Sequence, residues 1–349
     1  MPEMSLPERS TRTDGPTPML FPTPVVVDAD VLIRNVDYAV RKGYNPALFG
    51  RASAGYTALT GVVLFATPNV MDEVVRHLPD IARRRGDAKR VLQIWNSVVL
   101  SHVRVVPVPA EAMGDPLVAA VSILHAGDAP TAALALLLAP AVLATDNRRH
   151  FRPLDIPDTE TDSIAVDVYA LGEMGISINS LSVVPRVAGY AGVLGARKLA
   201  GAIGREATLF IGLVVVGALV LYLTNDRSRP LRERLSLAAK EMGPPVMAEL
   251  EKILAAGQRV AEFAVATGEP SAVTIVARHL AVERPILRTR EIVDLLAGHD
   301  LRWVPARLEL RKARAWLIGQ GCFHEVQYGR WGLGYQRAEL TTLSDDGEN

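Results

Sequence analysis

The chain contains one cysteine, Cys322, among its 349 residues. A single thiol excludes an intrachain disulfide and a zinc site built on cysteines, and it is consistent with a reducing compartment. An excess of charge of either sign is also missing, because 38 Lys and Arg balance 38 Asp and Glu. The total charge therefore indicates no partner, and any partner that binds through charge has to be recognised from a local cluster.

The first 24 residues lack the apolar stretch of a secretory signal peptide. They mix proline, threonine, serine and charged residues, a composition typical of disordered segments, so we expect residues 1–24 to form a disordered tail. The chain is long enough for two or more domains. Apolar residues make up 49% of the sequence, which is ample for a buried core.

From residue 25 onward, short apolar runs alternate with segments of helical spacing. The runs at 25–27, 60–66, 103–108 and 141–145 predict strands, and the segments between them predict helices. Alternation of this kind predicts an α/β fold, with a mostly parallel sheet covered by helices on both faces. Asn69 is the expected N-cap of the helix that follows the second run.

Acidic residues lie at the ends of these predicted elements. Asp28 follows the first strand and Asp146 the last, and sites in open α/β sheets gather at the carboxyl ends of strands. Asp128 precedes an apolar helix, and Glu73 lies near the start of an earlier one. Taken singly, Asp128 is explained as a helix N-cap and Asp146 as a turn residue.

Four segments carry these acids in order: VVVDADVLI with Asp28, PNVMDEVVRHL with Glu73, DAPTAALAL with Asp128 and LATDNRRHF with Asp146. In order and spacing, over about residues 25–176, the segments resemble the PIN-domain nucleases, including the toxin ribonucleases of bacterial toxin–antitoxin pairs. The sequence departs from that family at two positions. Asn69 stands where Ser or Thr is common, and Asn147 stands where a further Asp is common.

The resemblance implies a three-layer α/β/α fold and a metal-dependent endoribonuclease, a hydrolase that cleaves RNA phosphodiester bonds. It implies Mg²⁺ or Mn²⁺ on Asp28, Asp128 and Asp146, with Glu73 binding the metal, directly or through water, or orienting the attacking water. Both ions prefer oxygen ligands, and clustered carboxylates repel one another unless a cation neutralises them. Asp30 is a further ligand candidate if the first strand extends to it.

The segment after the fourth acid could meet substrate phosphate. Candidate substrate contacts are Arg148, Arg149, Asn69 and Asn147. His150 shares this segment, for which an ordinary solvated loop is the alternative. We expect His77 and His125 not to be ligands. The alternative is a catalytically inactive protein with a PIN fold that binds nucleic acid or has a regulatory role. The partners considered are RNA, an antitoxin protein, a membrane and a second copy of the chain in a homodimer.

A long hydrophobic run follows a linker rich in small residues, 177–206. Residues 207–224 read ATLFIGLVVVGALVLYLT, which is 18 residues without a charge. A bilayer span needs about 20 apolar residues, with a range of about 17–25. The run predicts a transmembrane helix that anchors a cytoplasmic nuclease domain, residues 25–176, to the cytoplasmic membrane. A fully buried core helix is the alternative.

Beyond this run we expect a helical connector over 225–270, a small domain over 271–340 and an acidic, disordered tail over 341–349. Three predicted helices and a hairpin make the small domain resemble a winged helix–turn–helix. Residues 275–337 hold eleven Lys and Arg against six Asp and Glu, a net of +5. Four basic residues crowd the third helix: Arg307, Arg311, Lys312 and Arg314. Nucleic-acid binding and protein interaction both remain open for this domain.

Overall fold

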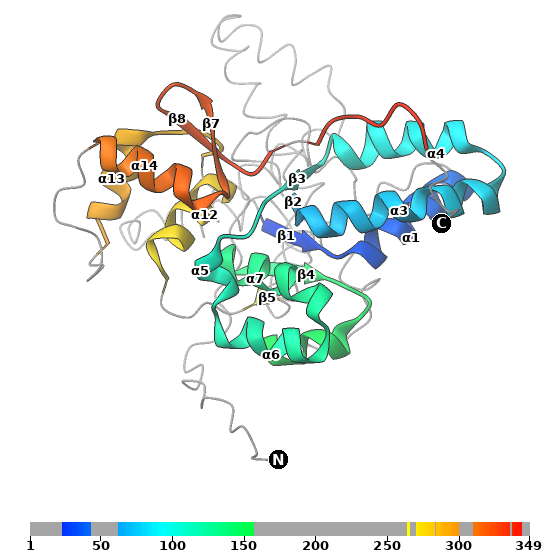
Figure 1. The fold of residues 1–349 in the computed structure, drawn as a ribbon, viewed down its shortest axis with the longest axis horizontal. Helices are drawn as coiled ribbons and strands as arrows, with labels where there is room; N and C mark the ends of the chain where they lie inside the picture. Colours follow the sequence, from blue (N-terminus) through cyan, green and yellow to red (C-terminus); the bar gives the residue numbers. More distant parts are fainter. Residues whose placement is uncertain are drawn as a thin grey trace, which may run out of the picture.

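A five-stranded sheet of order β3-β2-β1-β4-β5 lies at the centre of the computed structural model (Figure 1). The structure describes residues 23–42, 62–156, 264–265, 270–282, 284–299, 310–335 and 337–343. The strands are β1 (Thr23–Val27), β2 (Val62–Ala66), β3 (Val103–Val105), β4 (Ala141–Ala144) and β5 (Ala264–Val265). The first four run parallel, and β5 pairs antiparallel with β4. The predicted α/β class with a mostly parallel sheet is therefore confirmed.

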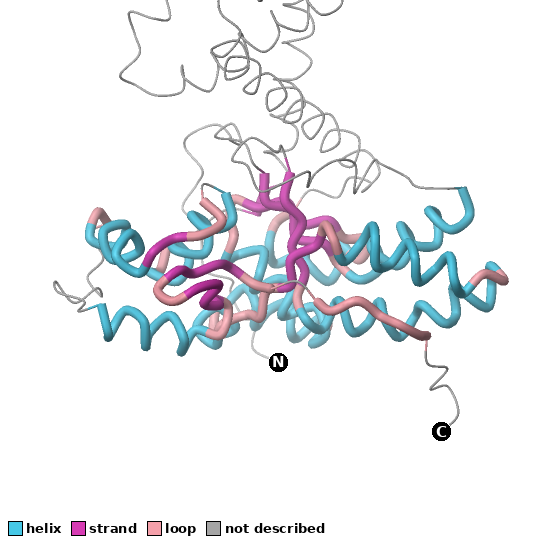
Figure 2. Tube along the Cα trace, turned by 90° about the horizontal axis from the view of Figure 1, so that it is seen from above, coloured by secondary structure: helices cyan, strands magenta, loops and turns pink. Residues whose placement is uncertain are grey.

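Side chains of the strands alternate between two buried layers. Along β1, Val25 and Val27 join one hydrophobic cluster and Val26 joins the other, as the two-residue period of a strand requires. One face is covered by α1 (Ala29–Lys42), α3 (Pro68–Arg85), α4 (Ala88–Ile94) and the π-helical turn η1 (Trp95–Leu100). The other is covered by α6 (Pro116–Leu124), α7 (Ala129–Leu137) and α12 (Ala272–Val282). The sheet thus lies between two helical layers (Figure 2).

The strand order reverses between β1 and β4. From β1 the chain moves outward to β2 and then β3, and it returns to the other side of β1 to form β4. The crevice at the carboxyl ends of two such strands is where open α/β sheets place their ligands. The connection from β3 to β4 runs through α5 (Ala110–Met113), α6, the 3-10 turn η2 (Ala126–Asp128) and α7.

The start of α3 differs from the predicted one. Thr67 is the N-cap, and its Oγ1 accepts a hydrogen bond of 3.4 Å from the Val70 N–H. Asn69, the predicted cap, is an exposed residue of the first turn. The prediction was wrong because Pro68 favours the first helical position, which places the cap one residue earlier.

Several predicted elements have other bounds. The helical pattern over 80–100 is interrupted at Gly86, which ends α3 in a left-handed conformation (φ +69°). The third strand covers three residues of the predicted 103–108. In the predicted helical connector, Ala264–Val265 forms a strand instead, because its backbone pairs with the edge of β4.

The C-terminal elements are α12, β6 (Leu287–Arg288), α13 (Thr289–Ala297), α14 (Leu310–Gln320), β7 (Phe323–Gln327) and β8 (Arg330–Leu333). The three strands form a second, antiparallel sheet of order β6-β8-β7. Three helices and a β7–β8 hairpin match the elements predicted for this part of the chain. In Figure 1 they lie on the opposite side of the central sheet from α1, α3 and α4.

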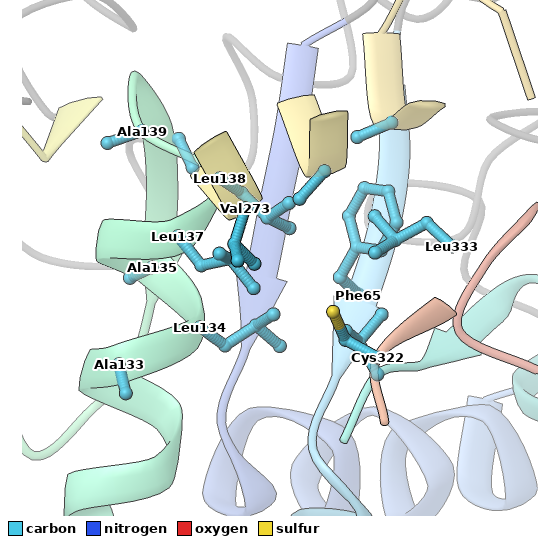
Figure 3. Close-up of a cluster of buried hydrophobic side chains, with 14 of the residues drawn as sticks. Phe65, Ala133, Leu134, Ala135, Leu137, Leu138, Ala139, Val273, Cys322 and Leu333 are labelled. Carbon is cyan, nitrogen blue, oxygen red and sulfur yellow. The ribbon is translucent and has the colours of Figure 1, made fainter. Parts of the chain in front are cut away.

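These elements share a hydrophobic cluster with the central sheet. Phe65 of β2 packs in the same cluster as Leu134 of α7, Val273 of α12, and Cys322 and Leu333 at the hairpin (Figure 3). Cys322 is buried, and burial raises the pKa of its thiol to about 12, which favours the protonated form. The residues predicted as a small domain are therefore packed into the core of the sheet.

Backbone pairing continues this contact toward the C-terminus. Tyr335 and Val105 exchange two backbone hydrogen bonds, of 2.8 and 2.9 Å. Further on, the Asn96 side chain donates to the Leu340 carbonyl at 2.8 Å and accepts from its N–H at 3.0 Å. Leu343 also packs against the core. The chain is therefore held as far as Leu343, the third residue of the segment predicted to be disordered, because Leu340 and Leu343 pack against the hydrophobic cluster on this face of the sheet.

No helix in the described ranges has the length and apolarity needed to cross a membrane. The hydrophobic run 207–224 lies outside those ranges. The same is true of residues 1–22, of 157–263 and of most of the predicted connector.

We predict that Gly334→Ala destabilises the protein through the contact of the hairpin with β3. Gly334 has a φ of +64°, and a Cβ atom there would lie 2.4 Å from the Val105 carbonyl oxygen. Strain and overpacking should lower the free energy of unfolding by about 2 kcal/mol or more. Gly319→Ala is the control, because a Cβ at Gly319 meets nothing within 4 Å. Urea unfolding measures both, and equal stability of the two variants would contradict the docking of the hairpin.

Candidate metal and carboxylate site

Asp28 is held at the carboxyl end of β1 by both neighbouring strands. Its backbone N–H donates to the Ala144 carbonyl at 3.0 Å, which continues the β1–β4 ladder. Its Oδ1 accepts from the Ala29 N–H at 2.9 Å, and its Oδ2 accepts from the Thr145 hydroxyl at 2.8 Å. With 5% of its surface exposed, Asp28 is a fixed carboxyl group at the crevice of the sheet.

The charge of Asp28 is poorly compensated. Burial raises the pKa of its carboxyl to about 6, and the nearby charges of Asp128 and Asp30 act in the same direction. The hydrogen bonds from Thr145 and Ala29 oppose this shift. Within the described part of the chain, no Lys, Arg or His pairs with Asp28. A cation bound nearby would favour its ionised form.

Asp128 lies at the start of α7, but its side chain makes no capping hydrogen bond. Its Oδ1 lies 3.1 Å from Nδ1 of His125, and its Oδ2 lies 2.7 Å from Nδ1 of His150. The two imidazole rings stack, with centroids 4.7 Å apart and planes inclined by 11°. Asp128 therefore occupies the N-cap position without capping the helix, because its carboxylate is held by two histidines.

His125, Asp128 and His150 form a group that could hold a metal ion. One donor atom from each residue lies within 4.8 Å of the other two. His125, which was not expected to be a ligand, belongs to this group because it precedes Asp128 by three residues on the turn that leads into α7. In the sequence, the His-x-x-Asp spacing and a histidine shortly after β4 were the available signals. His77, on α3, lies outside this group.

Asp146 and Asp30 belong to the same edge of the sheet but have other partners. Asp146 follows β4, and its Oδ2 lies 3.0 Å from Nη1 of Arg34 on α1. Asp30 is in the first turn of α1, and its Oδ2 accepts a hydrogen bond from the side-chain amide of Asn147. Both carboxylates are thus tied across the β1–β4 crevice, one through an ion pair and the other through an amide.

Glu73 is half-buried in α3, and its side chain makes no hydrogen bond or ion pair with another described residue. The four predicted acids therefore come together only in part. Asp28 and Asp128 are close enough for their charges to interact, whereas Glu73 and Asp146 join no compact group of donor atoms among the described residues.

The residues after Asp146 form a 3-10 turn, η3 (Arg148–Leu154), in place of an extended loop. Phe151 and Leu154 anchor the turn in the core, with exposures of 0% and 1%. This anchoring fixes His150, while Arg149 points to solvent and Arg148 is half-buried.

One basic side chain of α14, the third helix of the C-terminal elements, is paired with an acid of the same protein. Arg314 donates to both carboxylate oxygens of Glu325, at 3.1 and 2.6 Å, and its guanidinium lies 5.2 Å from the centre of the Tyr328 ring. The Arg314 hydrogen bond is the largest cause that lowers the pKa of Glu325. Arg311 and Lys312 are exposed on α14, and Arg307 lies outside the described residues.

No family model, curated protein or solved structure matches this chain.

We predict that Asp28→Asn makes the metal-free protein more stable above pH 6. The pKa of Asp28 rises on folding from 3.8 to about 6, so the folded state holds a proton that the unfolded state releases. The free energy of unfolding should therefore fall as pH rises through this window, with a cost of about 3 kcal/mol at pH 7. Asparagine removes that cost, because it carries no charge.

Urea unfolding at pH 4 and pH 7 in the presence of chelator measures this effect. The variant and the wild type should be nearly equal at pH 4, and the variant should be more stable at pH 7. Asp294→Asn, at an exposed position on α13, is the control without such a gain. A wild type that gains stability relative to Asp28→Asn between these pH values would contradict the burial of an ionisable Asp28.

A second prediction separates two arginines of α14. The nucleic-acid-binding interpretation of α14 predicts that Arg311→Glu weakens binding by the full chain and reduces its salt dependence, because an exposed arginine that contacts phosphate releases counterions. Arg314→Glu should instead lower the melting temperature, because Glu325 loses its partner and meets a like charge. Salt-dependent fluorescence anisotropy and thermal unfolding distinguish them. Equal binding by wild type and Arg311→Glu would favour a protein-interaction role for this helix.

Proposed function

We propose that this protein is a metal-dependent endoribonuclease that hydrolyses RNA phosphodiester bonds at the carboxylate edge of its sheet. One observation carries the proposal. Asp28 is buried without a cationic partner among the described residues, and its charge faces Asp128, at the point where the strand order reverses. A buried acid without a cationic partner, close to a second carboxylate, costs folding free energy, which a bound cation would recover.

The donor set fits Mg²⁺ or Mn²⁺, which take carboxylate oxygens and keep several waters. Asp28 and Asp128 would hold the ion. When bound, such an ion supplies an acidified water and polarises a phosphoryl oxygen. Asp146 lies one strand away and would join as a third ligand on release from Arg34. Glu73, free of partners among the described residues, would orient the attacking water or bind through one.

Positive charge beside this edge would position the RNA backbone. Arg149 is exposed on η3, immediately after the strand that carries Asp146, and Arg148 precedes it. Arginine binds phosphate through two parallel hydrogen bonds, which gives both attraction and orientation. Asn147 and Asn69 would contribute neutral contacts.

Two finer features of the proposal rest on the resemblance of the four acidic segments to PIN-domain nucleases: a PIN-type three-layer fold, and a role as a toxin neutralised by a small antitoxin protein. The parallel sheet between two helical layers supports the first of them. The winged-helix-like C-terminal part rests on its three helices and hairpin, and anchoring by residues 207–224 rests on the uncharged hydrophobic run. Formation of a homodimer is a further part of the proposal.

One observation favours the alternative, a PIN-type fold that binds nucleic acid without cutting it. The ion pair between Arg34 and Asp146 neutralises a carboxylate that the catalytic arrangement needs, with a distance of 3.0 Å between Nη1 and Oδ2. The two functions differ in a single measurement, because only the enzyme cleaves RNA when Mn²⁺ or Mg²⁺ is supplied and stops when chelator is added.

We expect the full-length protein to cleave RNA with Mn²⁺ and Asp28→Asn to lower the rate by about 100-fold or more, which equals about 2.7 kcal/mol of transition-state free energy. Cleavage of a labelled RNA, followed on a denaturing gel, measures the rate. Asp80→Asn is the matched control, because Asp80 is an exposed acid of α3. Cleavage that survives in Asp28→Asn or in chelator would overturn the mechanism.

A further inference from the structure

The group His125, Asp128 and His150 offers a metal ion nitrogen as well as oxygen donors. Nδ1 of His125 and Nδ1 of His150 approach the two oxygens of Asp128 from opposite ends of the carboxylate, at 3.1 and 2.7 Å. The two rings stack nearly parallel, with centroids 4.7 Å apart. One donor atom from each of the three residues therefore lies within 4.8 Å of the other two.

The spacing suits a four-coordinate ion. Bonds of about 2.0–2.1 Å to nitrogen and oxygen place the ligands of a tetrahedral zinc site about 3.3 Å apart. The observed contacts are slightly shorter and the widest separation is at most 4.8 Å, so small side-chain rotations would produce this geometry. Three protein ligands leave a fourth position open to water or substrate.

The fold holds these ligands in place. His150 is fixed by η3, whose neighbouring Phe151 is fully buried. His125 ends α6, and its ring packs over Gly127: a Cβ added there would lie 3.2 Å from the Cε1 atom of the ring and 3.4 Å from Nδ1. The glycine therefore leaves the room in which the His125 ring turns toward Asp128. His125 is the exposed ligand and His150 the shielded one, with side-chain exposures of 55% and 19%.

Imidazole nitrogen selects among metals. Mg²⁺ and Ca²⁺ prefer oxygen ligands, whereas Zn²⁺, Co²⁺ and related ions accept imidazole readily. A pair of histidines on one carboxylate is therefore a poor site for the Mg²⁺ of the proposed nuclease and a good one for a transition metal. Asp128 is the residue common to both features, because its charge also reaches Asp28.

We infer that His125, Asp128 and His150 form a binding site for a zinc-class transition-metal ion, with one coordination position open. The site goes beyond the proposed nuclease activity and does not depend on it. A metal in this position would bind through the lone pairs of the two Nδ1 atoms, so the proton of each neutral ring would reside on Nε2.

The test uses the full-length chain, stripped with chelator and titrated with Co²⁺ alone. Binding should produce the visible absorption of four-coordinate Co²⁺ at about one equivalent. Zn²⁺ should displace the Co²⁺ and abolish the band, while an excess of Mg²⁺ should leave it unchanged. A band that is absent, or that Mg²⁺ removes, would overturn the inference.

Single-residue variants assign the ligands. His125→Gln and His150→Gln should each weaken Co²⁺ binding by about 100-fold or more. This loss exceeds the roughly 10–100-fold loss of metal affinity typical of replacing a residue that only orients a ligand. Gly127→Ala keeps every ligand and should weaken binding less, because the His125 ring has to move by a few tenths of an ångström. The matched control is His77→Gln. His77 also precedes an aspartate by three residues, with 4.0 Å between Nδ1 of His77 and Oδ2 of Asp80, but no second histidine joins it.

Circular dichroism of each variant shows whether it is folded. If a histidine variant does not fold, the weaker Co²⁺ binding expected of Gly127→Ala provides the test instead. Unchanged Co²⁺ affinity in folded His125→Gln and His150→Gln would overturn the site. Asp28→Asn separates the two proposals: it should lose Mn²⁺-dependent RNA cleavage yet keep the Co²⁺ band. A wild type that binds Co²⁺ but cuts no RNA would remove the proposed function and leave this site intact.

Discussion

The parallel pairing of β1 with β4 positions the carboxylate edge. The register joins Val25 to Val142 and Val27 to Ala144, so both strands end at the same level of the sheet. Asp28 consequently reaches the hydroxyl of Thr145 across the two strands. The acids on α1 and after β4 meet their partners across the same crevice. A shift of one residue in this register would turn alternate side chains to the opposite face and separate all of these groups.

Electrostatic repulsion between Asp28 and Asp128 connects the two proposed metal features. Asp28 faces neutral donors among the described residues, and its pKa is raised by burial. Asp128 has two imidazoles instead, which can neutralise it as cations or share a metal with it. The two carboxylates therefore suit different metal ions. Mg²⁺ or Mn²⁺, which prefer oxygen ligands, suit Asp28, and an ion that accepts nitrogen ligands suits Asp128 with its histidines.

The C-terminal elements contribute to the stability of this site because they share a core with the sheet. The cluster that contains Phe65 of β2 also contains Val273 of α12 and Trp331 of β8. The short strand β5 completes the sheet beside β4, which carries Asp146 at its other end. Changes in the C-terminal part should therefore alter the stability of the carboxylate edge, even where they touch no acid.

Sequence patterns were sufficient to predict the α/β class, the positions of Asp28 and Asp146 at strand ends, and the C-terminal hairpin. These features follow from the two-residue and 3.6-residue periods of apolar side chains, which are local properties of the chain. The partners of the charged groups could not be predicted in this way: the histidines on Asp128, Arg34 on Asp146 and Glu325 on Arg314. Each of the last two pairs joins separate elements, and His150 reaches Asp128 from beyond β4. Such contacts depend on how the elements pack in space, which spacing along the sequence does not contain.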